Sequence, residues 1–126
     1  MEFDSRRSMP SPTGAALNLY VAVPQGAARA VVQVNHGLAE HAARYARFAR
    51  FLAGRGFAVY AHDHRGHGHT TAPDAPQGSF GPGPASERVI ADVAAVHDLI
   101  ATERPGLPVI VFGHSMRALI ALNFVL

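Results

Sequence analysis

The stretch VFGHSMRALI, residues 111–120, is a β-branched run that enters a Gly-His-Ser-Met turn and leaves as an apolar segment. A G-x-S-x-G turn between a strand and a helix holds its serine in a strained conformation above the sheet, at the N-terminus of the helix. Ser115 is therefore a candidate nucleophile, and the Met116 amide is a candidate donor to an oxyanion. A serine that caps an ordinary buried helix explains the same residues about equally well.

Arg117 stands where this turn pattern has its second glycine. The glycine lets the helix pack closely on neighbouring strands. A long side chain there either crowds the packing, at a cost of about 1–3 kcal/mol, or turns to solvent. A cation in the first helical turn also opposes the helix dipole. We therefore expect Arg117 to weaken the turn.

A second strand-to-helix junction lies at residues 35–41, NHGLAEH. His36 and Gly37 follow a β-branched run, and the amide of Leu38 is placed to supply a second oxyanion donor. A His-Gly pair after a strand is common. Two such motifs in this order, each at a strand-to-helix junction, nevertheless support one another. We expect His36, Gly37 and His114 to contribute to substrate binding.

The order of the predicted elements indicates an α/β fold. Strands are predicted at residues 16–23, 28–37, 56–63 and 109–114, and amphipathic helices at 41–54 and 86–102. This alternation predicts a mostly parallel sheet with helices on both faces, and the turn before residue 16 adds an antiparallel first hairpin. The apolar segment after residue 117 needs cover on both sides. We therefore expect residues 1–126 to form a single, incomplete domain.

The amino-acid composition argues against several classes of protein function. At 48% hydrophobic and 16% charged residues, 126 residues suit one globular domain. The sequence has no apolar run long enough for a transmembrane segment, and its first ten residues lack a signal-like apolar core, so a cytoplasmic protein is expected. A net charge of +2 with scattered arginines argues against nucleic-acid binding, and the lack of cysteine excludes thiolate chemistry.

Three motifs in order, HGxxEH, DxxGHG and GHSM, occur in residues 34–68 and 107–116. Together they resemble the monoacylglycerol lipase and lysophospholipase branch of the α/β-hydrolases. The resemblance implies a serine hydrolase that cleaves carboxylic esters of monoacyl lipids or similar small molecules, without a cofactor. It also implies Ser115 as the nucleophile and the amides of Leu38 and Met116 as the oxyanion hole.

Four histidines lie within the ten residues AHDHRGHGHT, residues 61–70. They are His62, His64, His67 and His69. With Asp63 they suggest a zinc site, since imidazole and carboxylate are ligands of that metal. Such a site needs three or four converging ligands, and the same residues match the glycine-rich loop of the family motif. We therefore favour a structural loop and expect no metal.

A serine hydrolase also needs a base and an acid, which in α/β-hydrolases follow the serine in the order Asp or Glu, then His. Eleven residues follow Ser115, and none is acidic or histidine. We therefore expect little turnover from this chain. The alternative is a non-catalytic hydrolase-like domain that binds a ligand or self-associates through an uncovered sheet edge and its apolar terminal segment.

Overall fold

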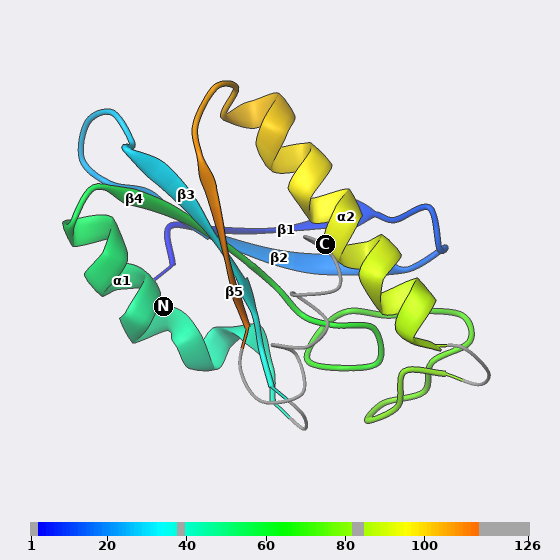
Figure 1. Cartoon of the computed structure of the whole chain (residues 1–126). Coiled ribbons are helices and arrows are strands. Elements are labelled where there is room, and N and C mark those ends of the chain that lie inside the picture. Colours follow the sequence, from blue (N-terminus) through cyan, green and yellow to red (C-terminus); the bar gives the residue numbers. More distant parts are fainter. Residues whose placement is uncertain (1–2, 38–39, 82–84, 114–126) are drawn as a thin grey trace.

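The computed structural model describes residues 3–37, 40–81 and 85–113, which form one sheet flanked by helices (Figure 1). The elements in chain order are β1 Ser5–Pro10, β2 Ala16–Ala22, β3 Ala30–Asn35, the 3-10 turn η1 Ala42–Tyr45, α1 Ala46–Gly54, β4 Phe57–His62, α2 Ala85–Glu103 and β5 Val109–Gly113. The predicted α/β fold class is confirmed, and the elements lie where the sequence patterns put them to within a few residues.

The sheet has the strand order β1-β2-β4-β3-β5. β1 pairs with β2, and β2 with β4, in antiparallel fashion. β3 lies parallel to both β4 and β5. The antiparallel first hairpin and the parallel remainder are both confirmed. Crossing between parallel strands requires a long connection, which α1 and α2 supply.

The two helices cover opposite faces of the sheet (Figure 1). Alternate residues of β2 point to opposite faces, as the pleat of a strand requires. Leu17 and Leu19 pack in the cluster that contains the buried side of α2. Tyr20 and Ala22 pack in the cluster that contains α1. A strand buried on both faces explains why β2 shows only partial alternation in sequence.

The amphipathic character predicted for helix 86–102 is confirmed. The helical repeat places Val89, Val93, Val96 and Ile100 on one face of α2, and all four are buried. In α1, Ala49 and Ala53 are buried against the sheet. Arg50 of α1 is half-buried and forms an ion pair with Asp4 at 3.2 Å.

Across residues 3–37, 40–81 and 85–113, none of the helices combines the length and the apolar character that a membrane crossing requires.

Candidate active site

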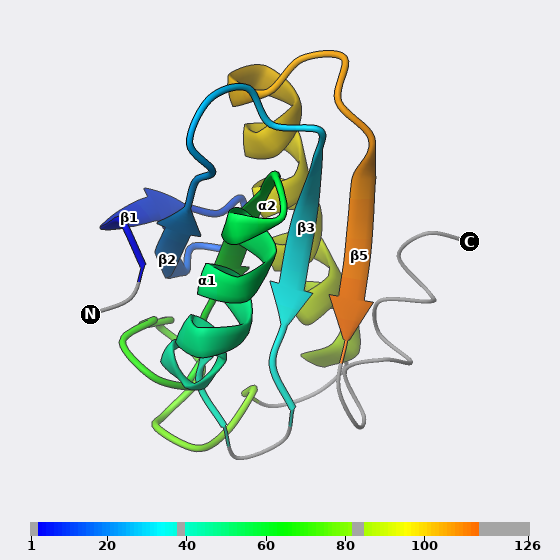
Figure 2. The same ribbon diagram turned by 90° about the vertical axis from the view of Figure 1, so that its left-hand side faces the viewer.

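The parallel strands bring the sequence motifs to one edge of the sheet. Asn35, at the end of β3, pairs with His62 of β4 and with Gly113 of β5. Figure 2 shows β3 and β5 side by side and pointing the same way. The turns that follow these strands therefore start at the same level. Ligand sites of open α/β sheets lie at this carboxyl edge.

The structure describes part of the predicted site. His36 and Gly37 lie within the described residues, directly after β3. The proposed oxyanion donor of Leu38 lies outside them. So do His114, Ser115 and Met116, the residues of the nucleophile turn, together with Arg117 and the apolar segment that follows it.

The imidazole of His36 links two loops at this edge. The side chain is fully buried. Its Nε2 lies 2.9 Å from the backbone nitrogen of His64, which donates to it. Nε2 must then be unprotonated, so the hydrogen of the neutral ring is on Nδ1, which donates to the Gly37 carbonyl at 2.8 Å. Both ring nitrogens are thus used within the protein.

Glu40 holds the other side of the same turn. Its carboxylate accepts the backbone N–H of Gly37 at 2.7 Å. The hydroxyl of Tyr45 lies 3.2 Å from both carboxylate oxygens, and burial together with this carboxylate raises the pKa of Tyr45. The motif glutamate therefore anchors the start of the turn to η1.

Burial controls the charge of two histidines at this edge. It lowers the pKa of His36 to about 4, with the Gly37 carbonyl opposing the shift. It also lowers the pKa of His62 to about 4, with the nearby Asp63 carboxylate opposing. Both imidazoles are therefore neutral at pH 7.

Asp63 organises the loop after β4 through hydrogen bonds. It is almost fully buried, and its carboxylate accepts from Asn18 Nδ2 at 2.9 Å, from the Ala42 amide at 2.7 Å and from the His69 amide at 3.0 Å. These donors belong to β2, to the start of η1 and to the loop itself. One carboxylate thus joins three segments that are distant in sequence.

The clustered histidines pack as rings. The ring centroid of His64 lies 4.4 Å from that of His36 and 4.9 Å from that of His62. The rings of His67 and Phe80 are tilted by 32° to one another, with centroids 4.8 Å apart. His69, by contrast, is exposed. Within the described parts of the chain, no three His, Cys, Asp or Glu side chains are arranged to hold a metal ion. The buried rings of His62, His64 and His67 thus contact other aromatic side chains.

A buried ion pair joins the loop after β4 to α2, and the sequence analysis did not predict it. Arg65 is fully buried, and its guanidinium lies 3.1 Å from the equally buried Asp92 of α2. It also pairs with Asp74. The hydroxyls of Ser11 and Thr13 donate to the second oxygen of Asp92, each at 2.6 Å. The signal in the sequence was an aspartate on the buried stripe of α2.

Gly66→Ala is expected to lower the free energy of unfolding by about 1–3 kcal/mol more than Gly78→Ala. Both glycines have positive φ, +72° and +84°, so both substitutions strain the backbone. A Cβ at Gly66 also overlaps the carbonyl oxygen of Ser79, whereas no described atom lies within 4 Å of one at Gly78. Urea unfolding of the two variants measures the difference, and equal losses would show that the close approach is relieved without cost.

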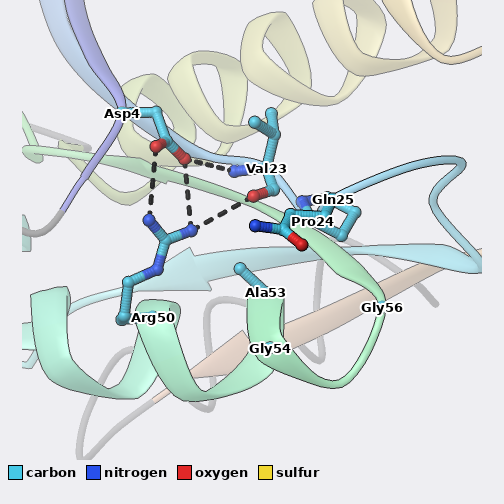
Figure 3. A pocket seen from close by; sticks show the side chains of 8 residues that line it. All are labelled: Asp4, Val23, Pro24, Gln25, Arg50, Ala53, Gly54 and Gly56. Atoms are coloured by element: carbon cyan, nitrogen blue, oxygen red, sulfur yellow. Dashed lines mark hydrogen bonds and ion pairs between the residues drawn. The ribbon is translucent and has the colours of Figure 1, made fainter.

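A pocket lies at the opposite edge of the sheet, between the end of β2 and the end of α1 (Figure 3). The carboxylate of Asp4 accepts a hydrogen bond from the Val23 amide at 2.7 Å. It also accepts one from each terminal guanidinium nitrogen of Arg50, at 3.2 Å. These bonds lower the pKa of Asp4. The residues that line the pocket include no histidine and no hydroxyl side chain.

Comparison with known proteins agrees with this architecture. The family model described as serine aminopeptidase, S33, matches residues 26–126. A human monoglyceride lipase is 37% identical over 79% of this chain and 31% of its own length. A monoacylglycerol lipase from Mycolicibacterium smegmatis is 35% identical over 89% of this chain and 38% of its own length. The chain thus spans about a third of the length of these curated relatives.

The fold is shared with a solved structure of a soluble variant of monoglyceride lipase from Saccharomyces cerevisiae. The TM-score is 0.81 at 22% identity, over 97% of this chain and 39% of the other. At that identity the likeness concerns the fold alone. With the family match over residues 26–126, the chain belongs to the serine aminopeptidase S33 family and is a monoglyceride lipase-like α/β-hydrolase.

Proposed function

We propose that this chain carries the nucleophile half of a serine hydrolase that cleaves carboxylic esters, with monoacylglycerols or similar monoacyl lipids as substrates. Ser115 is the nucleophile, and the amides of Leu38 and Met116 form the oxyanion hole. The names of the human and mycobacterial relatives support the substrate class. The motifs HGLAEH and GHSM support the residue roles.

The observation that carries the proposal is the register between β3 and β5. Asn35 pairs with Gly113, so the His-Gly turn and the Gly-His-Ser-Met turn leave adjacent strands at the same level. An acyl oxygen bound at Ser115 must receive hydrogen bonds from donors about 2.7–3.1 Å away. Neighbouring parallel strands are the arrangement that brings a donor from one turn near a nucleophile on the other.

The reaction proposed for Ser115 is acyl transfer. Its hydroxyl oxygen attacks the ester carbonyl, the oxyanion hole stabilises the tetrahedral oxyanion, and the alcohol leaves with the serine proton. Water then releases the acid. The 126 residues contain no acid or histidine after Ser115, so we expect slow turnover. Enzymes that lose a triad member keep a rate about 10³–10⁴-fold above water from the oxyanion hole and binding, which leaves a measurable reaction.

A fluorophosphonate probe tests the proposal on the 126-residue chain. We expect slow labelling, located by peptide mass spectrometry at Ser115, and slow hydrolysis of a p-nitrophenyl ester. Ser115→Ala is expected to abolish both. Ser86→Ala is the matched control, because Ser86 is an exposed serine at the start of α2 and is expected to leave both unchanged.

Two results would contradict the proposal. Labelling that is the same in wild type and Ser115→Ala would mean that another group reacts. A folded chain whose Ser115 is no more reactive than a free serine would favour the non-catalytic, ligand-binding alternative.

A further inference from the structure

We propose that the outer side of α1 is a docking surface for an anionic lipid bilayer. This basic face consists of Arg44 of η1, Arg47 and Phe51 of α1, and Arg55 directly after the helix. The choice of a lipid as the partner rests on the proposed function, whose substrates are lipids. The contacts within the basic face do not involve Ser115.

The helical repeat gathers the basic face on one side of α1. Its members are separated by three or four positions, and residues with that spacing are neighbours along a helix surface. Ala49 and Ala53 lie on the other side of the helix and are buried against the sheet. All four members of the basic face are exposed. In Figure 2, α1 lies on the side of the sheet that faces the viewer. The basic face is therefore the surface that α1 turns away from the core.

Acidic side chains do not balance the arginines of the basic face. α1 has no acidic residue, since its sequence is ARFARFLAG. Arg44 lies 3.9 Å from Glu40, whose carboxylate also accepts a hydrogen bond from the Gly37 amide at 2.7 Å. Within the described part of the chain, neither Arg47 nor Arg55 forms an ion pair. The basic face therefore carries an uncompensated positive charge.

The two helices on opposite faces of the sheet differ in the sign of their charge (Figure 1). α2 contains four acidic residues and one arginine, which are Glu87, Asp92, Asp98, Glu103 and Arg88. The net charge of the whole sequence is only +2, yet α1 and its two ends are basic while α2 is acidic. A surface of one sign attracts the opposite sign over a Debye length, about 8 Å at physiological salt. An anionic bilayer is therefore attracted to the α1 side of the molecule.

Phe51 adds an apolar contact in the middle of the basic face. It lies four positions from both Arg47 and Arg55, and 56% of it is exposed. The guanidinium carbon of Arg55 lies 5.0 Å from the centroid of the ring, within the range of a cation–π contact. Arginine side chains lay their aliphatic stems on lipid and keep their charge among the head groups, and aromatic rings are favoured at the same depth. The basic face thus combines the two kinds of contact that hold a helix on a bilayer surface.

Arg29 extends the basic surface past the end of α1. Its Nη1 donates to the Arg55 carbonyl at 3.5 Å, and its guanidinium carbon lies 5.5 Å from the ring centroid of Phe57. With Arg44 and Arg47, four exposed arginines lie along this side of the molecule. Clusters of about four to eight basic side chains on a helix are typical of surfaces that bind anionic lipid.

A single tryptophan locates the contact, because the chain has none. Phe51→Trp puts the fluorophore in the basic face, and Ala101→Trp puts it at an exposed position of α2 as the matched control. With vesicles of equal parts phosphatidylcholine and phosphatidylglycerol, we expect the emission of Phe51→Trp to shift to shorter wavelength and that of Ala101→Trp to stay unchanged. With phosphatidylcholine alone we expect neither to shift, since the arginines then lack an anionic partner.

Two charge reversals measure the electrostatic part of binding by co-sedimentation with the anionic vesicles. An arginine near such a bilayer contributes about a factor of 5 to the partition coefficient, and reversal also adds a repulsion, so Arg47→Glu is expected to weaken binding about 10–30-fold. Arg104→Glu makes the same change in net charge after the end of α2 and is expected to stay within about threefold of wild type. Phe51→Ser removes the apolar contact and is expected to weaken binding about tenfold.

Equal weakening by Arg47→Glu and Arg104→Glu would mean that net charge alone drives binding, and a shift of both tryptophans would mean unspecific adsorption. Either result would overturn the inference. Tighter binding to a DNA duplex than to the anionic vesicles would overturn it too, because the partner would then be a nucleic acid. Vesicle binding without labelling of Ser115 would support the inference and contradict the proposed function. Labelling of Ser115 without vesicle binding would contradict the inference alone.

Discussion

Arg65→Met is expected to lower the free energy of unfolding by about 3–5 kcal/mol, because it removes one partner of a buried ion pair. The guanidinium and the carboxylate of Asp92 are both fully buried and lie 3.1 Å apart. Methionine fills much of the volume but leaves the carboxylate of Asp92 fully buried without its cationic partner. The two hydroxyl donors of Ser11 and Thr13 remain, yet neither neutralises the charge. Urea unfolding at pH 7 measures the loss.

Arg50→Met is the matched control for this prediction. Arg50 pairs with Asp4 through two nitrogens at 3.2 Å, but both side chains are about two-fifths exposed (Figure 3). Exposed pairs contribute about 0.2–1 kcal/mol, so the same substitution is expected to cost far less. If the two variants lose equal stability, burial is not the cause.

The double variant Arg65→Met/Asp92→Asn distinguishes an unpaired charge from lost packing. Asparagine keeps an oxygen for the hydroxyls of Ser11 and Thr13 but carries no charge. The double variant is therefore expected to be more stable than Arg65→Met alone. A double variant that is less stable than Arg65→Met would show that packing around the guanidinium, and not the isolated carboxylate, determines the loss.

The sequence predicted those features that depend on short-range periodicity. The stripe formed by Val89, Val93, Val96 and Ile100 follows from the helical repeat alone, and the structure buries all four. The sequence also placed His36 and Gly113 at the ends of predicted strands, and the structure pairs Asn35 with Gly113. The strand order β1-β2-β4-β3-β5 was not predicted, because alternation of strands and helices leaves the order of strands in the sheet open.

The contacts that shape the site depend on pairs distant in sequence. Asp63 was predicted as the last residue of strand 56–63 and the first of the DxxGHG motif, but its three donors come from β2, η1 and its own loop, and no local pattern specifies them. The bond from the His64 amide to His36 joins residues 28 positions apart. Arg65 and Asp92 are 27 apart. A buried charge signals that a partner exists, but only the fold identifies it.

These contacts make the loop after β4 a structural connection at the carboxyl edge of the sheet. The same ten residues supply the amide that holds His36, the carboxylate that holds η1 and the guanidinium that holds α2. The histidine-rich segment thus connects the end of β3, η1 and α2. Burial keeps the ring of His62 neutral at pH 7, because it lowers the pKa of this imidazole to about 4.

Acidification from pH 7 to pH 5 is expected to lower the free energy of unfolding by about 2 kcal/mol for each of His36 and His62. Their pKa values are about 4 in the folded chain, against 6.5 for an exposed histidine. Between these values the unfolded chain binds more protons than the folded one. Stability is therefore full above pH 6.5 and declines as the pH falls toward 4. Urea unfolding at the two pH values, at constant ionic strength, measures the change.

His62→Leu isolates one of the two contributions. Among the described residues, neither ring nitrogen of His62 has a hydrogen-bond partner, so the substitution removes a desolvated polar group and is expected to cost little at pH 7. At pH 5 the variant is expected to have lost about 2 kcal/mol less than wild type, because it has one histidine fewer to protonate on unfolding. The same loss in both proteins would mean that His62 is not held neutral by burial. His36→Asn removes the other contribution in the same way, because asparagine does not titrate and the pKa of about 4 belongs to the buried imidazole.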